Sequence, residues 1–382
     1  MSEAPAPDRK DKNHQHLKPT KMKIPASLGI LLSIALQTLA QGDQRLIVVT
    51  SDGVRWQEVF KGLDPVIASD KRFNQGDSAG LFERFGGSTA EERRRRLMPF
   101  TWGTVAAKGR IHGNRAYGNK VDVANPHWFS YPGYSELMTG QVDTSINTND
   151  YPPNPYVNLL EYLNRKPGYT GKVAAFAAWD AFDRILNEQR AGFPVINGYD
   201  DNSKASKSPE MRLINDMLQD SYKPWGMIES QDVFIHYSAF THLRQARPKV
   251  LYIAYGDTDE FAHHSQYKFY IEAIRQLDKF LSDIWNWVQS QPEYRDRTTL
   301  LVTTDHGRGD LEKSQWTDHG RSVSDASQSW FMVMGPKVKA GGEIKSPGIY
   351  HTKQFAQTAA MLMGLEFKPA HRVAEAIGEV AK

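Results

Sequence analysis

The stretch LIVVTSDG, Leu46–Gly53, is an apolar, β-branched run that ends at a carboxylate, Asp52. The same order recurs in TLLVTTDHG, Thr299–Gly307, where Asp305 and His306 close the run. Short apolar runs of this kind predict strands that are buried on both faces, as in parallel sheets. Parallel strands end at one edge of a sheet, and α/β proteins bind ligands there. Both polar clusters are therefore expected at a single ligand-binding edge.

Five apolar runs rich in β-branched residues predict the strands of this sheet. They are Leu46–Thr50, Val173–Ala178, Val250–Tyr255, Thr299–Thr303 and Trp330–Met334. Between them lie helical patterns such as those that begin at Tyr267 and Thr352. Alternating strands and helices predict an α/β fold with a mostly parallel central sheet and helices on both faces. We see no linker that divides the chain, so residues 41–382 are expected to form one domain.

Residues 1–40 are expected to be a leader and signal peptide outside this domain. The segment from Met22 has a basic start, an apolar stretch and small residues up to Ala40. This layout is typical of a secretory signal cleaved after Ala40, and it predicts a periplasmic or secreted protein. Two alternatives stay open, namely an uncleaved N-terminal anchor and a start at Met22 rather than Met1.

Composition excludes several classes of site. The chain has no cysteine, which excludes disulfides, thiolate metal sites and a cysteine nucleophile. The 47 basic and 44 acidic side chains are nearly balanced, so nothing favours a nucleic-acid partner. The basic cluster Arg93–Arg96 is expected to be the solvated face of a helix. The oligomeric state cannot be read from these features.

Two further motifs contain residues of the types that bind metals. Asp259 and His263 lie four positions apart in YGDTDEFAHH, and His319 lies in WTDHG. At that spacing Asp259 and His263 share one face of a helical turn and can reach one ion. Any one pair alone is better explained as a capping Asp beside a surface His. Three clusters after three strands, together with His319, favour a metal site.

A candidate nucleophile lies in NPHWFSYPGYSELMTG, where Ser130 precedes a predicted helix from Tyr134 to Thr139. A serine at a helix N-terminus lies near backbone N–H groups that favour an anion such as phosphate. A serine hydroxyl needs a base or a metal to become nucleophilic, and the predicted metal site supplies one. The alternatives are that Ser130 only caps the helix, or that Ser135 is the nucleophile.

Together these motifs resemble the alkaline phosphatase superfamily, especially its type I phosphodiesterase/nucleotide pyrophosphatase branch. The likeness rests on SDG at Asp52, FSYPGYSELMTG at Ser130, GDTDEFAH at Asp259, TTDHG at Asp305 and WTDHG at His319. The motifs occur in the order found in that family. The resemblance implies an alkaline phosphatase-like fold.

The resemblance also implies two sets of metal ligands. One metal would be held by Asp52, Asp305 and His306 together with the nucleophile Ser130, and the other by Asp259, His263 and His319. His351 is the alternative to His319, because in some branches the last ligand comes late in the chain. Asp257 and His264 lie beside ligand positions and are expected at most to support them.

The activity that the resemblance implies is metal-dependent hydrolysis of a small phosphate ester, either a phosphodiester or a phosphomonoester. Two divalent ions would clamp the displacement, and a covalent phosphoserine would form on Ser130. Carboxylate and imidazole ligands suit Zn²⁺, although Mn²⁺ or Fe fits the same ligands. A sulfate-ester hydrolase is an alternative, but Tyr134 stands where sulfatases carry Arg. A metal-binding protein without turnover is the other alternative.

The sequence also offers candidates for the walls of the pocket and for contacts with the substrate. The loop-rich stretches Phe60–Arg96 and Asp143–Pro155 are expected to form walls of the pocket. Side chains near the motifs are candidates for binding phosphate or stacking on a leaving group. These candidates are Arg55, Arg308, Arg321, Asn125, Asn149, Asn154, Trp56, Trp128 and Trp316.

Overall fold

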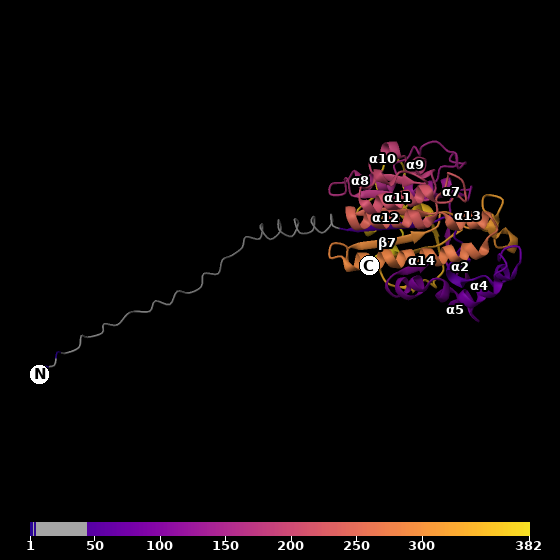
Figure 1. Ribbon diagram of the computed structural model, residues 1–382, viewed down its shortest axis with the longest axis horizontal. Helices are drawn as coiled ribbons and strands as arrows, with labels where there is room; N and C mark the ends of the chain where they lie inside the picture. Colours follow the sequence, from indigo (N-terminus) through magenta and orange to yellow (C-terminus); the bar gives the residue numbers. More distant parts are fainter. Residues whose placement is uncertain (3, 5–43) are drawn as a thin grey trace. The chain divides into compact units, whose positions relative to one another are not determined.

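An eight-stranded sheet organises the part of the chain that the computed structural model describes, residues 1, 2, 4 and 44–382 (Figure 1). Its order is β10-β2-β9-β7-β1-β6-β4-β5. The strands are β1 (Arg45–Ser51), β2 (Arg110–His112), β4 (Val173–Ala177), β5 (Val195–Asn197), β6 (Val250–Tyr255), β7 (Thr298–Thr303), β9 (Phe331–Met334) and β10 (Gly342–Glu343). From β7 to β5 all neighbours run parallel, whereas β9 is antiparallel to both β7 and β2. The prediction of a mostly parallel α/β sheet is confirmed.

The five predicted strands are the adjacent strands β9, β7, β1, β6 and β4, with ends within one residue of the expected positions. The strands that the sequence did not predict are all four residues or shorter. Three of them form a separate sheet in the order β11-β3-β8, namely β3 (Asn119–Asp122), β8 (Gln328–Ser329) and β11 (Gly348–His351). Runs this short have no readable periodicity, which is why they were missed.

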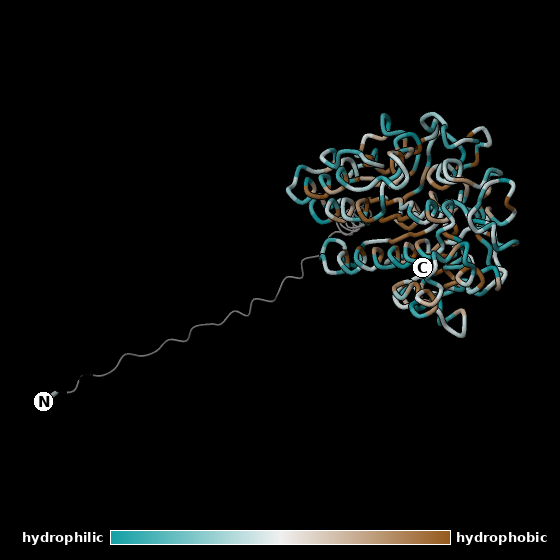
Figure 2. The backbone as a smooth tube through the Cα atoms, turned by 45° about the vertical axis from the view of Figure 1, so that its right-hand side comes forward, coloured by the Kyte–Doolittle hydropathy of each residue, from teal (hydrophilic) through white to brown (hydrophobic). Residues whose placement is uncertain are grey.

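Helices cover both faces of the large sheet because successive strand residues point to opposite sides. In β1, Ile47 and Val49 pack on one face, and Leu46 and Val48 pack on the other. The first face is covered by α2 (Trp56–Lys61), α3 (Pro65–Ser69), α4 (Ser78–Phe85), α5 (Ala90–Leu97), α12 (Asp232–Ala246), α13 (Asp257–His263) and α14 (Tyr267–Ser290). The second is covered by α7 (Ser130–Thr139), α8 (Leu159–Asn164), α9 (Phe182–Ile185), α10 (Glu188–Ala191) and α15 (Phe355–Leu362). Figure 2 shows the resulting apolar interior.

The remaining helical segments are short, apart from α11. They are η1 (Thr101–Val105), α6 (Ala106–Lys108), η2 (Arg115–Tyr117), η3 (Asn202–Lys204), α11 (Pro209–Asp220), η4 (Lys313–Thr317), η5 (Ser324–Ser327), η6 (Thr352–Gln354) and η7 (Gly378–Val380). The helix expected from Tyr267 is α14, and the one expected from Thr352 is η6 followed by α15. Both helix predictions are confirmed.

Two sequence-based expectations for the N-terminal half of the fold are wrong. Phe60–Arg96 is not a loop, because it holds the end of α2, all of α3 and α4, and most of α5. The basic cluster in α5 is not entirely solvated either. Arg94 is buried, with its guanidinium 2.8 Å from Glu343 and 3.6 Å from the centre of the Trp102 ring. Tertiary pairing with Glu343, distant in sequence, decides this burial.

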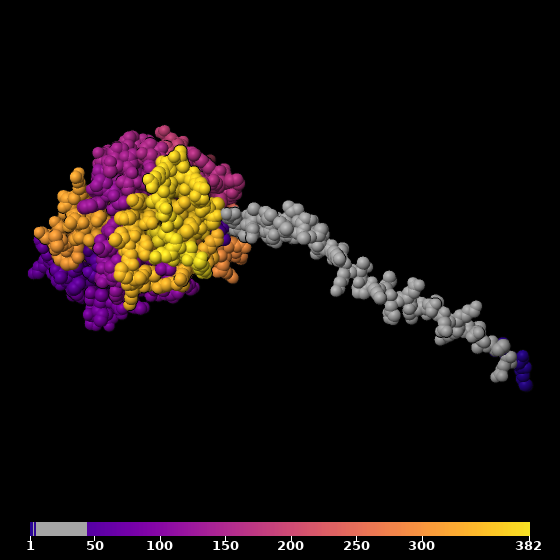
Figure 3. Space-filling view, turned by 180° about the vertical axis from the view of Figure 1, so that it is seen from behind, coloured from indigo at the N-terminus to yellow at the C-terminus, as the bar shows by residue number. Residues whose placement is uncertain are grey.

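The C-terminal residues return to the two sheets. β10 pairs with β2, and β11 pairs with β3. Figure 3 shows the C-terminal segment, in yellow, spread over one face of the folded unit. On this side the residues after β11 contact α7, where Thr352 Oγ1 donates to Glu136 at 2.6 Å. The C-terminus thereby supports the helix that begins at Ser130.

The expected signal peptide, the anchor alternative and the choice of start at Met1 or Met22 depend on residues 1–40, nearly all of which lie outside the described residues. These points stay predictions. Residues 44–382 belong to one compact unit. Within the described residues, no helix has the length and apolar character to cross a bilayer.

Candidate active site

The chain leaves β7, β1 and β6 at the same edge of the sheet. These strands are adjacent and parallel, with Thr50 of β1 opposite Thr303 of β7 and Ser51 opposite Tyr255 of β6. Each strand is therefore followed at that edge by polar residues, which are Asp52 after β1, Asp305 and His306 after β7, and the acidic first turn of α13 after β6. The prediction that these clusters share one edge is confirmed.

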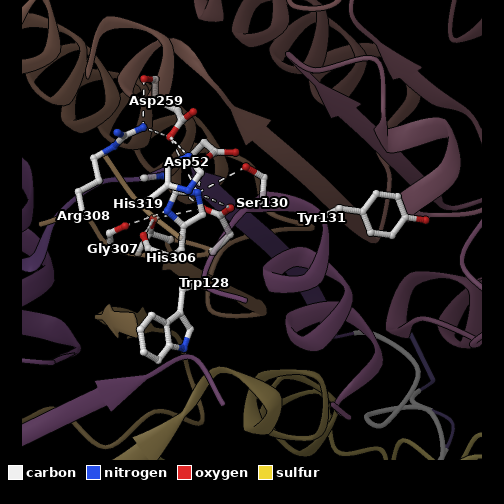
Figure 4. A network of polar contacts seen from close by, with 12 residues as sticks. Asp52, Trp128, Ser130, Tyr131, Asp259, His306, Gly307, Arg308 and His319 are labelled. Atoms are coloured by element: carbon white, nitrogen blue, oxygen red, sulfur yellow. Dashed lines mark hydrogen bonds and ion pairs between the residues drawn. The ribbon is translucent and has the colours of Figure 1, made fainter. Parts of the chain in front are cut away.

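A first group of side chains surrounds the imidazole of His306 (Figure 4). Its Nε2 lies 3.2 Å from Asp52 Oδ1 and 3.4 Å from Asp305 Oδ2. All three side chains are nearly or fully buried. His306 Nδ1 faces the carbonyl oxygen of Gly307 at 2.9 Å, and because a carbonyl only accepts, Nδ1 is the donor. In the neutral ring this leaves the lone pair of Nε2 directed at the two carboxylates.

A second group surrounds Asp259, in the first turn of α13. Asp259 Oδ2 lies 3.0 Å from His263 Nε2, and Asp259 Oδ1 lies 3.8 Å from His319 Nε2. The Nε2 atoms of His263 and His319 are 2.9 Å apart. Asp259 Oδ1 is also 3.9 Å from His306 Nε2, so the two groups are neighbours. The six ligand residues expected from the motifs meet at one place.

Two sets of side chains are close enough to hold a divalent cation. The ligand atoms of Asp52, Asp305 and His306 lie within 4.8 Å of one another, as do those of Asp259, His306 and His319, so His306 rather than His263 completes the second set. Among the described residues, Asp52 Oδ1 and Asp305 Oδ2 are buried carboxylate oxygens without a hydrogen-bond partner. Leaving such oxygens unpaired is costly, and a bound cation would remove that cost. The donor set of carboxylates and imidazoles suits Zn²⁺ and similar ions.

The pKa shifts in the first group, Asp52, Asp305 and His306, also favour a bound cation. Burial, followed by the charge of Asp52, raises the pKa of Asp305 well above its usual value. Burial and the charge of Asp259 also raise the pKa of Asp52. Burial alone would lower the pKa of His306, but Asp305 and Asp52 outweigh it and raise that pKa to about 9. Without a cation the group therefore retains protons, which a divalent ion would displace.

Asp259 differs because it has a permanent cationic partner. Burial would raise the pKa of Asp259, but Arg308 and then His263 outweigh it and hold that pKa well below the usual value. Arg308 is 1% exposed and donates to Asp259 Oδ1 through Nη2. The sequence had suggested Arg308 as a ligand for phosphate. Its guanidinium is instead bound within the cluster.

Ser130 is the first residue of α7, so it follows the N-cap residue Phe129 rather than capping the helix itself. Its Oγ lies 3.4 Å from His306 Nε2, and its side chain faces the metal-ligand cluster (Figure 4). The backbone N–H of Tyr131 donates to Asn149 Oδ1, and Pro132 has no N–H. Within this first turn, the N–H of Ser130 is therefore the group left for an anion. The N-terminus of α7 therefore has fewer free backbone N–H groups for a phosphate than the sequence suggested.

The alternative residues lie elsewhere. Ser135 is buried, and its Oγ accepts from Asn154 Nδ2 at 2.9 Å. His351 ends β11 in the three-stranded sheet and belongs to neither ligand group. The Asp257 carboxylate accepts from the backbone N–H of Asp232, and His264, which follows α13, is exposed. The structure thus brings Ser130 and His319 to the cluster, and not Ser135 or His351.

A cavity of about 350 Å³ opens over the two groups. Asn149 and Asp150 line it, which confirms that the loop Asp143–Pro155 forms a wall. None of the residues that line it belongs to Phe60–Arg96, so that part of the prediction is wrong. Sequence reasoning missed further lining residues, which are Trp179, Asp180, Arg184, Ile228, Glu229 and Glu260. A signal existed for two of them, because Trp179 and Asp180 follow the carboxyl end of β4 as Asp52 follows β1.

Most of the other suggested substrate contacts have structural roles. Arg55 is buried against Glu58 and the carbonyl of Gly309, and Arg321 is exposed. Asn125 binds Glu136, and Asn154 binds Ser135. Trp56 and Trp316 are core residues, whereas Trp128 is half-buried. Of this set, Asn149 is the residue that lines the cavity.

Residues 83–365 match the model of the family described as type I phosphodiesterase / nucleotide pyrophosphatase. The chain belongs to this family. The description of this family is that of enzymes that hydrolyse phosphodiesters and nucleotide pyrophosphates. No curated protein matches the chain.

Solved structures with the same fold include several members of the alkaline phosphatase superfamily. The alkaline phosphatase PafA is 11% identical, with a TM-score of 0.58 over 89% of this chain and 99% of that one. The lipoteichoic acid synthase LtaP from Listeria monocytogenes is 14% identical, with a TM-score of 0.54 over 87% and 74%. Murine ectonucleotide pyrophosphatase / phosphodiesterase 5 is 11% identical, with a TM-score of 0.50 over 89% and 100%. The expected alkaline phosphatase-like fold is confirmed.

Proposed function

We propose that this protein is a two-metal phosphodiesterase in which Ser130 is the nucleophile. The observation that carries the proposal is the position of Ser130 Oγ, 3.4 Å from His306 Nε2, beside two buried carboxylate oxygens that lack hydrogen bonds. A site built only for structure would not need a hydroxyl at that point. This argues against a metal-binding protein without turnover.

Each ion would have its own set of protein ligands. Asp52, Asp305 and His306 would hold the ion next to Ser130, and Asp259, His263 and His319 would hold the other. Zn²⁺ is the proposed metal because carboxylate and imidazole donors at a rigid sheet edge suit it. When bound, the ions would supply positive charge that lowers the pKa of the Ser130 hydroxyl and stabilises the oxygen of the leaving group.

The residues of the chain then perform a double displacement. The Ser130 oxygen bonds to phosphorus while the bond from phosphorus to the leaving alcohol breaks, which gives a phosphoserine. Water then cleaves the bond between phosphorus and Ser130 and restores the serine hydroxyl. Ser130 is 5% exposed and lines the cavity, where a substrate can reach its oxygen. The free N–H of Ser130 is placed to donate to a phosphoryl oxygen.

The charges that line the cavity favour a diester over a monoester. Four carboxyl side chains outside the ligand groups line it, those of Asp150, Asp180, Glu229 and Glu260, and burial raises the pKa of the last three. The one guanidinium that lines it, that of Arg184, lies 3.5 Å from Asp183. A monoester carries an extra negative charge that is usually held by an Arg fork, and Arg308 is engaged with Asp259. The singly charged diester needs less positive charge from the side chains of the cavity.

The other proposals rest on the sequence. Export to the periplasm or medium rests on the signal-like layout of residues 22–40, and a single catalytic domain on the absence of a linker from residue 41 onward.

A sulfate ester stays the alternative substrate. No side chain of the structure favours it, because Tyr134, which replaces the sulfatase Arg, is buried against Phe182.

Hydrolysis of bis(4-nitrophenyl) phosphate, 4-nitrophenyl phosphate and 4-nitrophenyl sulfate tests the proposal. We expect the diester to be the best substrate, with activity lost in a chelator and restored by Zn²⁺. Ser130→Ala should lower kcat by at least about 10³-fold with unchanged metal content, because it removes the nucleophile. Ser135→Ala, the matched control, should keep near wild-type activity. Turnover that survives both the chelator and Ser130→Ala would refute the proposal.

A further inference from the structure

Arg308 lies inside the metal-ligand cluster, and the proposed chemistry gives it no role. Its Nη1 donates to the carbonyl of Thr317 at 2.6 Å, and its Nη2 donates to the carbonyl of Asp259 at 3.1 Å. Nη2 also binds Asp259 Oδ1, the oxygen that lies 3.8 Å from His319 Nε2 and 3.9 Å from His306 Nε2. Two carbonyl contacts and 1% exposure hold the guanidinium in place, so it cannot swing away into solvent.

The backbone is shaped to admit this pair. Gly53 follows Asp52 and has φ of +61°, a conformation that other residues adopt only with strain. A Cβ at this position would lie 2.6 Å from Asp259 Oδ1 and 2.7 Å from Arg308 Nε. A larger residue at this position would have to displace Asp259 or Arg308, so glycine leaves room for the two side chains to meet. The pairing is a built feature of the site.

The two ligand groups consequently differ in free charge. The group of Asp52, Asp305 and His306 has two carboxylates with no cationic side chain bonded to them other than His306 itself. The group of Asp259, His263 and His319 has one carboxylate, and the guanidinium of Arg308 already neutralises it. A divalent ion at the second group would also lie close to a buried positive charge.

We propose that Arg308 makes the two metal positions unequal, so that the position of Asp52 and Asp305 fills first and the position of Asp259 binds its ion weakly and exchangeably. This inference rests on the proposed two-metal site. Its consequence is that the protein carries one resident ion at low metal concentration. The second ion then acts as an exchangeable activator.

Calorimetric titration of the metal-stripped full-length protein with Zn²⁺, in a competing chelator, tests the inference. We expect two classes of site whose dissociation constants differ on the order of 100-fold. Asp52→Asn should remove the tight class, and Asp259→Asn should remove the weak class. Arg308→Met should tighten only the weak class and bring the two within about tenfold of each other.

Arg184→Met is the matched control. Arg184 lines the same cavity and contacts the carbonyls of Asn149 and Tyr151 and the carboxylate of Asp183, so its loss removes one positive charge without freeing a ligand oxygen. It should leave both classes unchanged. Two classes of equal affinity in the wild-type protein would overturn the inference and leave the proposed function standing. The same conclusion would follow if Arg184→Met tightened the weak class as much as Arg308→Met does.

Weaker binding of the second ion in Arg308→Met would also overturn the inference, because Arg308 would then be holding Asp259 in place as a ligand. Failure of the wild-type protein to bind any ion would instead refute the proposed function. Should Arg308→Met not fold, the wild-type titration with the two Asp variants still decides the order of filling.

Discussion

Ser130 Oγ and His306 Nε2 lie 3.4 Å apart although the residues are separated by 176 positions. The first turn of α7 has to pack directly on the loop after β7 for this to occur. Gly133 permits that approach, because a Cβ there would lie 2.6 Å from the carbonyl oxygen of Asp305. The position of the nucleophile therefore depends on a missing side chain one turn along its helix.

Replacement of Gly133 by Ala is expected to push the first turn of α7 away from Asp305 and to displace Ser130. We predict a fall in kcat of about 100-fold, the size expected when a reacting group is misplaced by roughly 1 Å. Gly103→Ala is the control, because Gly103 is also helical and a Cβ there meets nothing within 4 Å. Steady-state kinetics of the two variants make the comparison. Equal activities would show that the packing of Gly133 does not position the nucleophile.

Glu136 fixes the other side of α7. Its buried carboxylate accepts from the backbone N–H groups of Ala124, Asn125 and Lys353 and from Thr352 Oγ1. We predict that Glu136→Gln lowers the free energy of unfolding by about 2–4 kcal/mol, since an amide cannot accept at all of these positions. Urea denaturation measures the change. The exposed Glu83→Gln should cost less than about 0.5 kcal/mol, and similar losses in the two variants would contradict this role.

Metal binding is expected to stabilise the fold as well as to supply chemistry. In the metal-free protein, burial and neighbouring charges raise the pKa of Asp52 and of Asp305, so a cation that takes the place of their protons binds the folded state and not the unfolded chain. A saturating concentration of Zn²⁺ should raise Tm by roughly 5 °C or more. Asp52→Asn should raise the Tm of the metal-free protein and reduce the shift that Zn²⁺ causes. If Zn²⁺ raised the Tm of Asp52→Asn as much as that of the wild-type protein, the ion would bind elsewhere.

His112 predicts how stability depends on pH. It is buried against Phe331, with ring centres 4.4 Å apart, and neither ring nitrogen has a hydrogen-bond partner among the described residues. Burial, and secondarily Arg110, lowers the pKa of His112 to about 3. The unfolded chain binds this proton near pH 6.5 and the folded chain does not. The stability that neutral His112 provides is thus complete above pH 6.5 and is lost progressively as pH falls towards 3.

Between pH 7 and pH 5 this residue is expected to account for about 2 kcal/mol of the stability lost by the wild-type protein. His112→Leu keeps a side chain of similar volume and should reduce that loss by the same amount, without changing kcat at pH 8. Urea denaturation of both proteins at the two pH values provides the measurement. An unchanged loss would mean that His112 is protonated in the folded state.

The sequence predicted the parts of the site that follow long strands. Asp52, Asp305 and His306 end runs of buried β-branched residues, so their common edge followed from the parallel arrangement. Ser130 and His319 do not follow such strands. Ser130 was predicted from its place before a helix, and His319 from its residue type in WTDHG, and the resemblance then gave both residues their roles. Glu229 and the engagement of Arg308 by Asp259 were not predictable, because they depend on contacts between loops that carry no periodic signal.

The same limit applies to the fold. The five central strands were predicted because each buries a full apolar run, whereas the edge strands of two to four residues have too few positions to show a pattern. Phe60–Arg96 was mistaken for a loop because its helices are short and rich in polar residues. Single apolar residues such as Ile67 and Leu81 bury these helices. They pack in one cluster with residues of α14, which are about 200 positions away in the sequence.

The most direct test of the account is anomalous diffraction from crystals of the full-length protein grown with excess Zn²⁺. We predict two anomalous peaks, one bounded by Asp52, Asp305 and His306 and lying within bonding distance of Ser130 Oγ, the other bounded by Asp259, His263 and His319. As the Zn²⁺ concentration is reduced, the second peak should fade first. Peaks at other residues, or the absence of any peak beside Ser130, would contradict the account.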